Sequence, residues 1–144
     1  MFSFFKSKKF KPDFPIFELD ESRDNVFEKL SDFAEVVTTP NPSKDVDVEY
    51  TAETEITCIS IGFNGDSICY LNYLTSQHNS NDKQKAIKLH WFLNHYGKIE
   101  EYNEPSDTGY LVIFSNPIRD ISVVLGLHMG PVRINKLNQG SYNA

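Results

Sequence analysis

An Asn-Gly pair between two β-rich runs is the feature that constrains this fold most. Residues 55–63 and 66–74 are rich in β-branched and aromatic side chains, and they flank Asn64-Gly65. A two-residue loop of this composition favours a type I′ hairpin turn, because both of its residues readily take positive φ. The sequence therefore predicts an antiparallel hairpin over these two runs.

The position of this turn also predicts how the two strands pair. If the strands close on the Asn-Gly pair, Cys58 lies opposite Leu71 and Ser60 lies opposite Cys69. The two cysteines then share one face of the hairpin, on a diagonal. Two small, buried, reduced thiols are the commoner arrangement for such a pair, and a disulfide is the alternative.

A first amphipathic helix is predicted before this hairpin. From residue 22 to residue 37, apolar residues recur at the 3.6-residue helical period, and acidic residues lie between them. Asp20 or Ser22 is the expected N-cap. The helix is expected to stop at residues 38–42, because each of the two prolines there disfavours the α conformation in the preceding residue.

A second helix and further strands follow from the same kind of pattern. Asp82 caps the predicted helix at residues 83–96, which ends at Gly97. Alternating or β-prone runs predict five more strands, at residues 45–50, 98–103, 109–115, 119–127 and 132–137. Short hairpin links between such elements are typical of an α+β domain. We expect one domain with two helices and a mostly antiparallel sheet of six to seven strands.

Charge is distributed unevenly along the chain. The 144 residues carry a formal net charge of −6. Residues 13–55 hold thirteen acidic and three basic residues, a net charge of −10, whereas residues 56–144 hold seven of each sign. Residues 1–12 carry four lysines and no acid, and we expect a basic aromatic arm there, before a domain at 13–137. The acidic segment predicts a field that attracts a basic partner.

Seven acidic residues of this segment are candidates for contacting such a partner. Those of the first helix lie opposite its apolar stripe, and those of residues 45–50 alternate along a strand, about 6 to 7 Å apart on one face. An edge strand whose charges prevent strand addition is the alternative explanation for the strand acids. Joined, the two groups form one negative surface made of Asp24, Glu28, Asp32, Glu35, Asp45, Asp47 and Glu49.

The sequence contains no complete catalytic or metal-site motif. His90 and His95 lie about 140° apart around a helix, which is too far for both to bind one metal ion. Phosphate-binding loops, dinucleotide fingerprints and Gly-x-Ser-x-Gly are absent. We therefore expect no enzymatic activity, no cofactor and no metal ion. The alternative is a small enzyme or ligand-binding domain with a pocket lined by Tyr70, Trp91, Tyr110 and His128.

An acidic chain of this length that opens Met1-Phe2-Ser3-Phe4-Phe5-Lys6 resembles the immunity proteins of bacterial contact-dependent inhibition and related interbacterial systems. The resemblance implies a cytoplasmic protein that binds a cognate toxin domain, often a nuclease with a basic active-site groove, and blocks it without chemistry. We expect no direct contact with nucleic acid. No run approaches the roughly 18 to 20 apolar residues that span a bilayer, and residues 138–144 are expected to be disordered.

Overall fold

Residues 9–128 and 130–137, which the computed structural model describes, form two α-helices, one 3-10 turn and eight strands. The helices are α2 (Arg23–Phe33) and α3 (Asp82–Tyr96), and the 3-10 turn is η1 (Ile99–Glu101). The strands are β1 (Val36–Ser43), β2 (Val46–Glu53), β3 (Thr57–Asn64), β4 (Ser67–Thr75), β5 (Ser106–Asp107), β6 (Leu111–Asn116), β7 (Ile121–Gly126) and β8 (Val132–Lys136). Most of the predicted basic arm and the predicted C-terminal tail lie outside the described residues.

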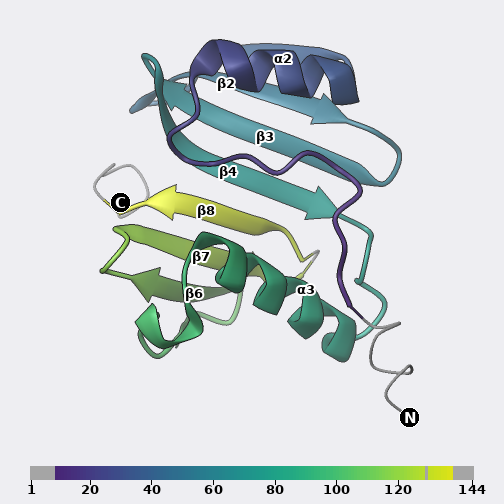
Figure 1. The fold of residues 1–144 in the computed structure, drawn as a ribbon, viewed down its shortest axis with the longest axis vertical. Coiled ribbons are helices and arrows are strands. Elements are labelled where there is room, and N and C mark those ends of the chain that lie inside the picture. Colours follow the sequence, from purple (N-terminus) through teal and green to yellow (C-terminus); the bar gives the residue numbers. More distant parts are fainter. Residues whose placement is uncertain (1–8, 129, 138–144) are drawn as a thin grey trace.

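All eight of these strands belong to one antiparallel sheet, in the order β1-β2-β3-β4-β8-β7-β6-β5. Both helices lie on one face of this sheet, α2 over the β1-β2 end and α3 over the other half (Figure 1). Residues 10–21 run between the two helices. We call this side the helix face and the opposite side the open face. The predicted α+β class is confirmed, with one strand more than the highest number expected.

Alternation along the strands builds the hydrophobic core on the helix face. Strand register places five buried side chains in one row across the sheet, Tyr50, Ile61, Leu71, Ile134 and Val123. Val26 and Leu30 of α2 and Phe92 of α3 are fully buried in the same cluster. The apolar stripe predicted for the first helix therefore faces the sheet through Val26 and Leu30, and the polar side of the helix faces solvent.

The first helix is shorter than predicted, and a strand replaces its last turn. Ser22 is the N-cap, and its Oγ accepts a hydrogen bond of 3.2 Å from the Asn25 N–H. The helix ends at Phe33, and β1 begins at Val36. A strand containing two prolines was not predicted, because proline cannot donate to a sheet ladder. It is tolerated here because β1 is the edge of the sheet.

The hairpin of β3 and β4 is confirmed, but its predicted register is wrong. Asn64 pairs with Ser67, so the two loop residues are Gly65 and Asp66, and Gly65 has φ +61°. Glycine at the first loop position is the type II′ arrangement, not type I′. A bulge after Gly62 then shifts the pairing further, so Cys58 lies opposite Leu74 and far along the strand from Cys69. Both cysteines are free thiols.

The strand predicted at residues 98–103 is also wrong. The structure has η1 there, and the short β5 supplies the first strand of the hairpin with β6. The 3-10 turn is held by Glu101, whose carboxylate accepts hydrogen bonds from the Lys98 N–H at 2.9 Å and from Arg119 Nε at 2.8 Å. Local polar contacts thus outweigh the weak β preference of this segment. The hairpin of β7 and β8 and the helix α3 are confirmed.

Candidate functional site

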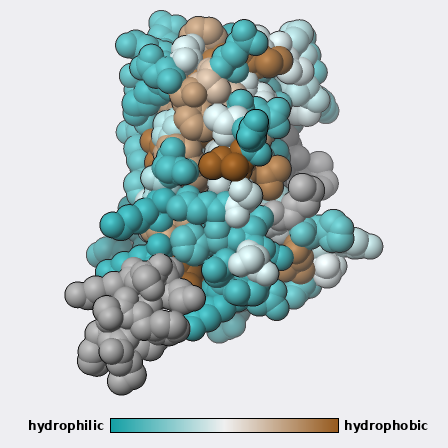
Figure 2. Space-filling model, turned by 90° about the vertical axis from the view of Figure 1, so that its right-hand side faces the viewer, coloured by the Kyte–Doolittle hydropathy of each residue, from teal (hydrophilic) through white to brown (hydrophobic). Residues whose placement is uncertain are grey.

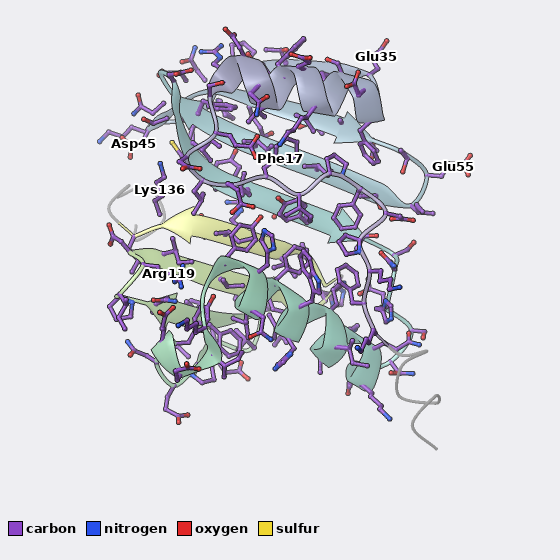
Figure 3. The ribbon with its side chains drawn as sticks, viewed as in Figure 1. Phe17, Glu35, Asp45, Glu55, Arg119 and Lys136 are labelled. Atoms are coloured by element: carbon purple, nitrogen blue, oxygen red, sulfur yellow. The ribbon has the colours of Figure 1, made fainter. Side chains whose placement is uncertain are left out.

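The acidic segment of the sequence becomes one acidic end of the molecule. Residues 13–55 build α2, β1 and β2, with α2 and β2 at the top of Figure 1, and the chain that crosses the sheet before them. Figure 3 places Glu35, Asp45 and Glu55 around this end, and Arg119 and Lys136 in the other half. Glu35, Asp45 and Glu55, which are far apart in the sequence, therefore lie around the same end of the molecule.

Four of the seven candidate acids lie on the solvent side of this end. Asp24, Glu28 and Asp32 are spaced four residues apart along α2, and Glu35 follows just after the helix. All four are exposed, and within the described part of the chain none of their carboxylates has a hydrogen-bond or ion-pair partner. We call these four residues the acidic stripe. Its carboxylates are available to another molecule.

The two basic residues of α2 do not neutralise the acidic stripe. Lys29 forms an ion pair of 2.9 Å with Glu21, and its ammonium also lies over the Phe17 ring. Arg23 donates from Nε to the Tyr50 hydroxyl at 2.9 Å and lies over that ring. Like charges four residues apart destabilise a helix by a few tenths of a kcal/mol for each pair. Glu28 and Asp32, which lie beyond the first turn, therefore do not serve the stability of α2.

The three strand acids are arranged differently from the prediction. Asp45 is half-buried at the turn before β2. Asp47 accepts a hydrogen bond of 2.6 Å from the Gly65 N–H, and Glu49 accepts one from the Tyr70 hydroxyl on the open face. Asp47 and Glu49 are thus engaged within the fold, and Glu49 lies across the sheet from α2. Their strand is also not the sheet edge, so edge protection does not explain them.

The four residues of the alternative pocket do not meet. Tyr70 is buried on the open face, whereas Trp91 lies on α3 against Phe10, on the helix face. Tyr110 is 83% exposed, and His128 is exposed in the connection between β7 and β8. A single pocket lined by all four is therefore excluded by the position of the sheet. Among the described residues, no group of three or more His, Cys, Asp or Glu side chains is placed to hold a metal ion.

The open face carries a polar cluster that the sequence did not predict. The Tyr70 ring lies flat over Gly62, where a Cβ atom would come within 2.3 Å of a ring carbon. The Arg133 guanidinium carbon stands 4.2 Å from the centre of the same ring. Burial, and then the hydrogen bond to Glu49, raise the pKa of the Tyr70 hydroxyl, which therefore stays protonated. The sequence signal for this contact is Gly62, because a glycine inside a strand often marks a place where another group approaches the backbone closely.

Two buried polar groups next to this cluster have no partner. Asn135 pairs in register with both Tyr70 and Ser122, so the three side chains lie in one row on the open face. Asn135 is 3% exposed and Ser122 is fully buried. Neither the Asn135 Nδ2 nor the Ser122 Oγ has a hydrogen-bond partner within the described chain. Burying a polar group without a hydrogen-bond partner costs about 1 to 3 kcal/mol of folding free energy, so these two groups destabilise the folded state.

We expect Ser122→Ala to raise the free energy of unfolding by about 1 kcal/mol, because the variant removes an unsatisfied hydroxyl and keeps the Cβ atom. Urea unfolding at pH 7 measures this change. Ser115→Ala is the matched control, since Ser115 is the half-buried neighbour of Ser122 in the same row. Equal effects at both positions would contradict a specific cost at Ser122.

The cysteines do not offer a reactive site. Burial raises the pKa of the Cys58 thiol and of the Cys69 thiol, and nearby carboxylates act in the same direction on both. Raised values keep both thiols protonated at neutral pH, which is the opposite of what an activated nucleophile requires.

The outer surface shows no large apolar area on the side that Figure 2 presents. Apolar side chains there form separate areas among hydrophilic ones.

Within the described residues, no helix is long and apolar enough to cross a membrane. Comparison of the chain with protein-family models, with curated proteins and with solved structures found no match.

Proposed function

We propose that the protein is a non-enzymatic binding protein of the toxin-immunity type, which neutralises a cognate bacterial toxin through its acidic end. The observation that carries this proposal is the acidic stripe of Asp24, Glu28, Asp32 and Glu35, whose carboxylates are exposed and unpaired in the described structure. The sequence predicts a binding surface that also includes Asp47 and Glu49. We leave these two residues out of the proposed surface, because their carboxylates accept hydrogen bonds within the fold.

The physical support for this role is the field of the acidic end. A concentrated negative surface accelerates the encounter with a basic partner and disfavours acidic ones. Phe27 supplies an apolar contact within the stripe, since it is 42% exposed and packs edge-on against Tyr50. An aromatic side chain bordered by charges resembles the centre of a protein interface. Action in the cytoplasm, where thiols stay reduced, agrees with the two free cysteines.

Reversal of two charges tests the surface. The partner tested is the protein encoded immediately upstream of this chain, because immunity genes lie next to their toxin genes. Glu28→Lys combined with Asp32→Lys is expected to lower the association rate constant about tenfold or more at low salt, and to flatten its salt dependence. Asp24 is left unchanged because it lies in the first turn of α2, where an acid stabilises the helix. Stopped-flow or surface-plasmon kinetics at two salt concentrations measure both effects.

The matched control is Glu100→Lys combined with Glu104→Lys, which makes the same change of charge at two exposed acids in the other half of the molecule. This control is expected to keep most of the wild-type rate. Equal losses in the two double variants would show a general charge effect and would overturn the assignment of the stripe. If the upstream protein arrests growth and co-expression of this chain does not restore it, the immunity role itself is rejected.

A further inference from the structure

The open face holds an arginine that stacks on an aromatic ring and has no charged partner within the described residues. Arg133 is half-buried on β8, and its guanidinium stands 4.2 Å from the centre of the Tyr70 ring. Within the described chain the guanidinium has no hydrogen-bond or ion-pair partner. Stacking on an aromatic ring orients the planar group and leaves its N–H donors free around its edge. Arg133 is therefore ready to donate to another molecule.

Two further donors lie beside this arginine. Asn135 is two residues further along β8 on the same face, about 6 to 7 Å away. Its Nδ2 and the Oγ of the adjacent Ser122 are buried and have no hydrogen-bond partner among the residues that the structure describes. Three neighbouring side chains thus present unsatisfied hydrogen-bond donors on one side of the sheet. Buried groups of this kind in native proteins call for a partner that completes them.

The Glu49 carboxylate does not fill this role. Glu49 is on β2, three strands from β8, and its carboxylate accepts the hydrogen bond of the Tyr70 hydroxyl, at the end of the ring on which Arg133 stacks. It forms no ion pair with Arg133. Within the described residues, no carboxylate therefore accepts a hydrogen bond from Arg133, from the Asn135 Nδ2 or from the Ser122 Oγ.

We propose that Arg133, Asn135 and Ser122 form a binding site for an oxyanion, a carboxylate or a phosphate group, on the open face. A flat guanidinium matches two oxygens of such a group, and the amide and hydroxyl donate to the others. Asn135 and Ser122 are covered in the structure, so the side chains over them must move before an anion reaches their donors. The site lies across the sheet from α2, so it is independent of the acidic stripe.

Amide chemical shifts of the full-length ¹⁵N-labelled protein test this site. Sodium phosphate and sodium acetate are titrated separately at pH 7, with sodium chloride exchanged to keep the ionic strength constant. We expect saturable shifts at the amides of residues 122, 133 and 135 and at the Asn135 side chain, with a Kd of about 1 mM. A response to phosphate alone or to acetate alone supports the site and identifies its ligand as that group.

Variants decide whether these donors are responsible. Arg133→Met is expected to weaken binding about tenfold or more, and Ser122→Ala to weaken it by a smaller factor while the protein becomes more stable. Arg119→Met is the control, since this arginine is paired with Glu101 at 2.8 Å. Far-UV circular dichroism establishes that each variant is folded. The proposal is overturned if neither anion shifts these amides, or if Arg133→Met binds as tightly as the control. Charge reversal at α2 is expected to leave the titration unchanged.

Discussion

Truncation of Phe17 to alanine is expected to lower the free energy of unfolding by about 3 to 5 kcal/mol. Phe17 is fully buried on the chain that runs between α2 and α3, at the centre of the helix face in Figure 3. Its backbone N–H donates to the Tyr73 hydroxyl at 3.0 Å, and its carbonyl accepts from the Tyr96 hydroxyl at 2.7 Å. Alanine keeps both backbone hydrogen bonds, so the loss measures the packing of the ring.

Urea unfolding of Phe17→Ala and of Phe27→Ala separates a core position from a surface one. Phe27 is 42% exposed on α2, so its truncation removes the same side chain with less loss of burial, and we expect a cost of about 1 kcal/mol. The larger loss at Phe17 would establish that the chain before α2 is part of the core. Similar losses of unfolding free energy in the two variants would contradict this, and would mean that the chain before α2 lies outside the core.

Sequence periodicity predicted the elements whose faces differ most in polarity. The apolar stripe of α2 and the alternation along β2 follow from which side chains are buried, and the structure places them as expected. On α3 the buried side includes the charged Lys88, which no apolar period marks. The edge strand β1 was missed because all but the first of its residues are exposed, so no period of two marks it. Its prolines are signals against a central strand, and only the order of strands reveals that it lies at the edge.

The two candidate sites differ in how far the sequence could predict them. Three of the four residues of the acidic stripe repeat every four residues on α2, and Glu35 follows the helix directly, so local spacing was enough to place the members together. The open-face cluster depends on pairing between β3, β4, β8 and β7, and the last two lie some fifty residues beyond the first two. The turn at Gly65-Asp66 and the one-residue bulge after Gly62 together shift that pairing from the predicted register. A local pattern carries no information about such a register, so the unpaired donors could not be foreseen.

Lys88 is a buried lysine that has no charged partner among the described residues. Its side chain on α3 is 1% exposed, and its Nζ donates to the Asn79 Oδ1 at 2.6 Å. The backbone of Gly130, with φ +76°, packs against both groups, because a Cβ there would lie 2.7 Å from the Asn79 Oδ1 and 3.2 Å from the Lys88 Nζ. Burial, and then the charge of Lys85, lower the pKa of the Lys88 ammonium from 10.5 to about 8.

This lowered pKa predicts how stability changes with pH. Below about pH 8 the ammonium is charged in both the folded and the unfolded state, so the folded state bears the full cost of burying it. Between pH 8 and 10.5 the folded protein has lost a proton that the unfolded chain still binds, so Lys88 makes the free energy of unfolding rise with pH. A shift of this size corresponds to about 2 to 3 kcal/mol over that range.

We therefore expect Lys88→Met, which keeps a long unbranched side chain, to gain stability relative to the wild type at pH 7 and to lose that advantage by pH 10.5. Taking the difference between the two proteins removes the opposite trend from buried thiols and tyrosines, whose raised pKa values lower stability in alkali. Urea unfolding at several pH values measures the difference, and Lys83→Met, at an exposed lysine of the same helix, controls for loss of one charge. Parallel curves for wild type and Lys88→Met would mean that the Lys88 ammonium reaches solvent in the folded protein.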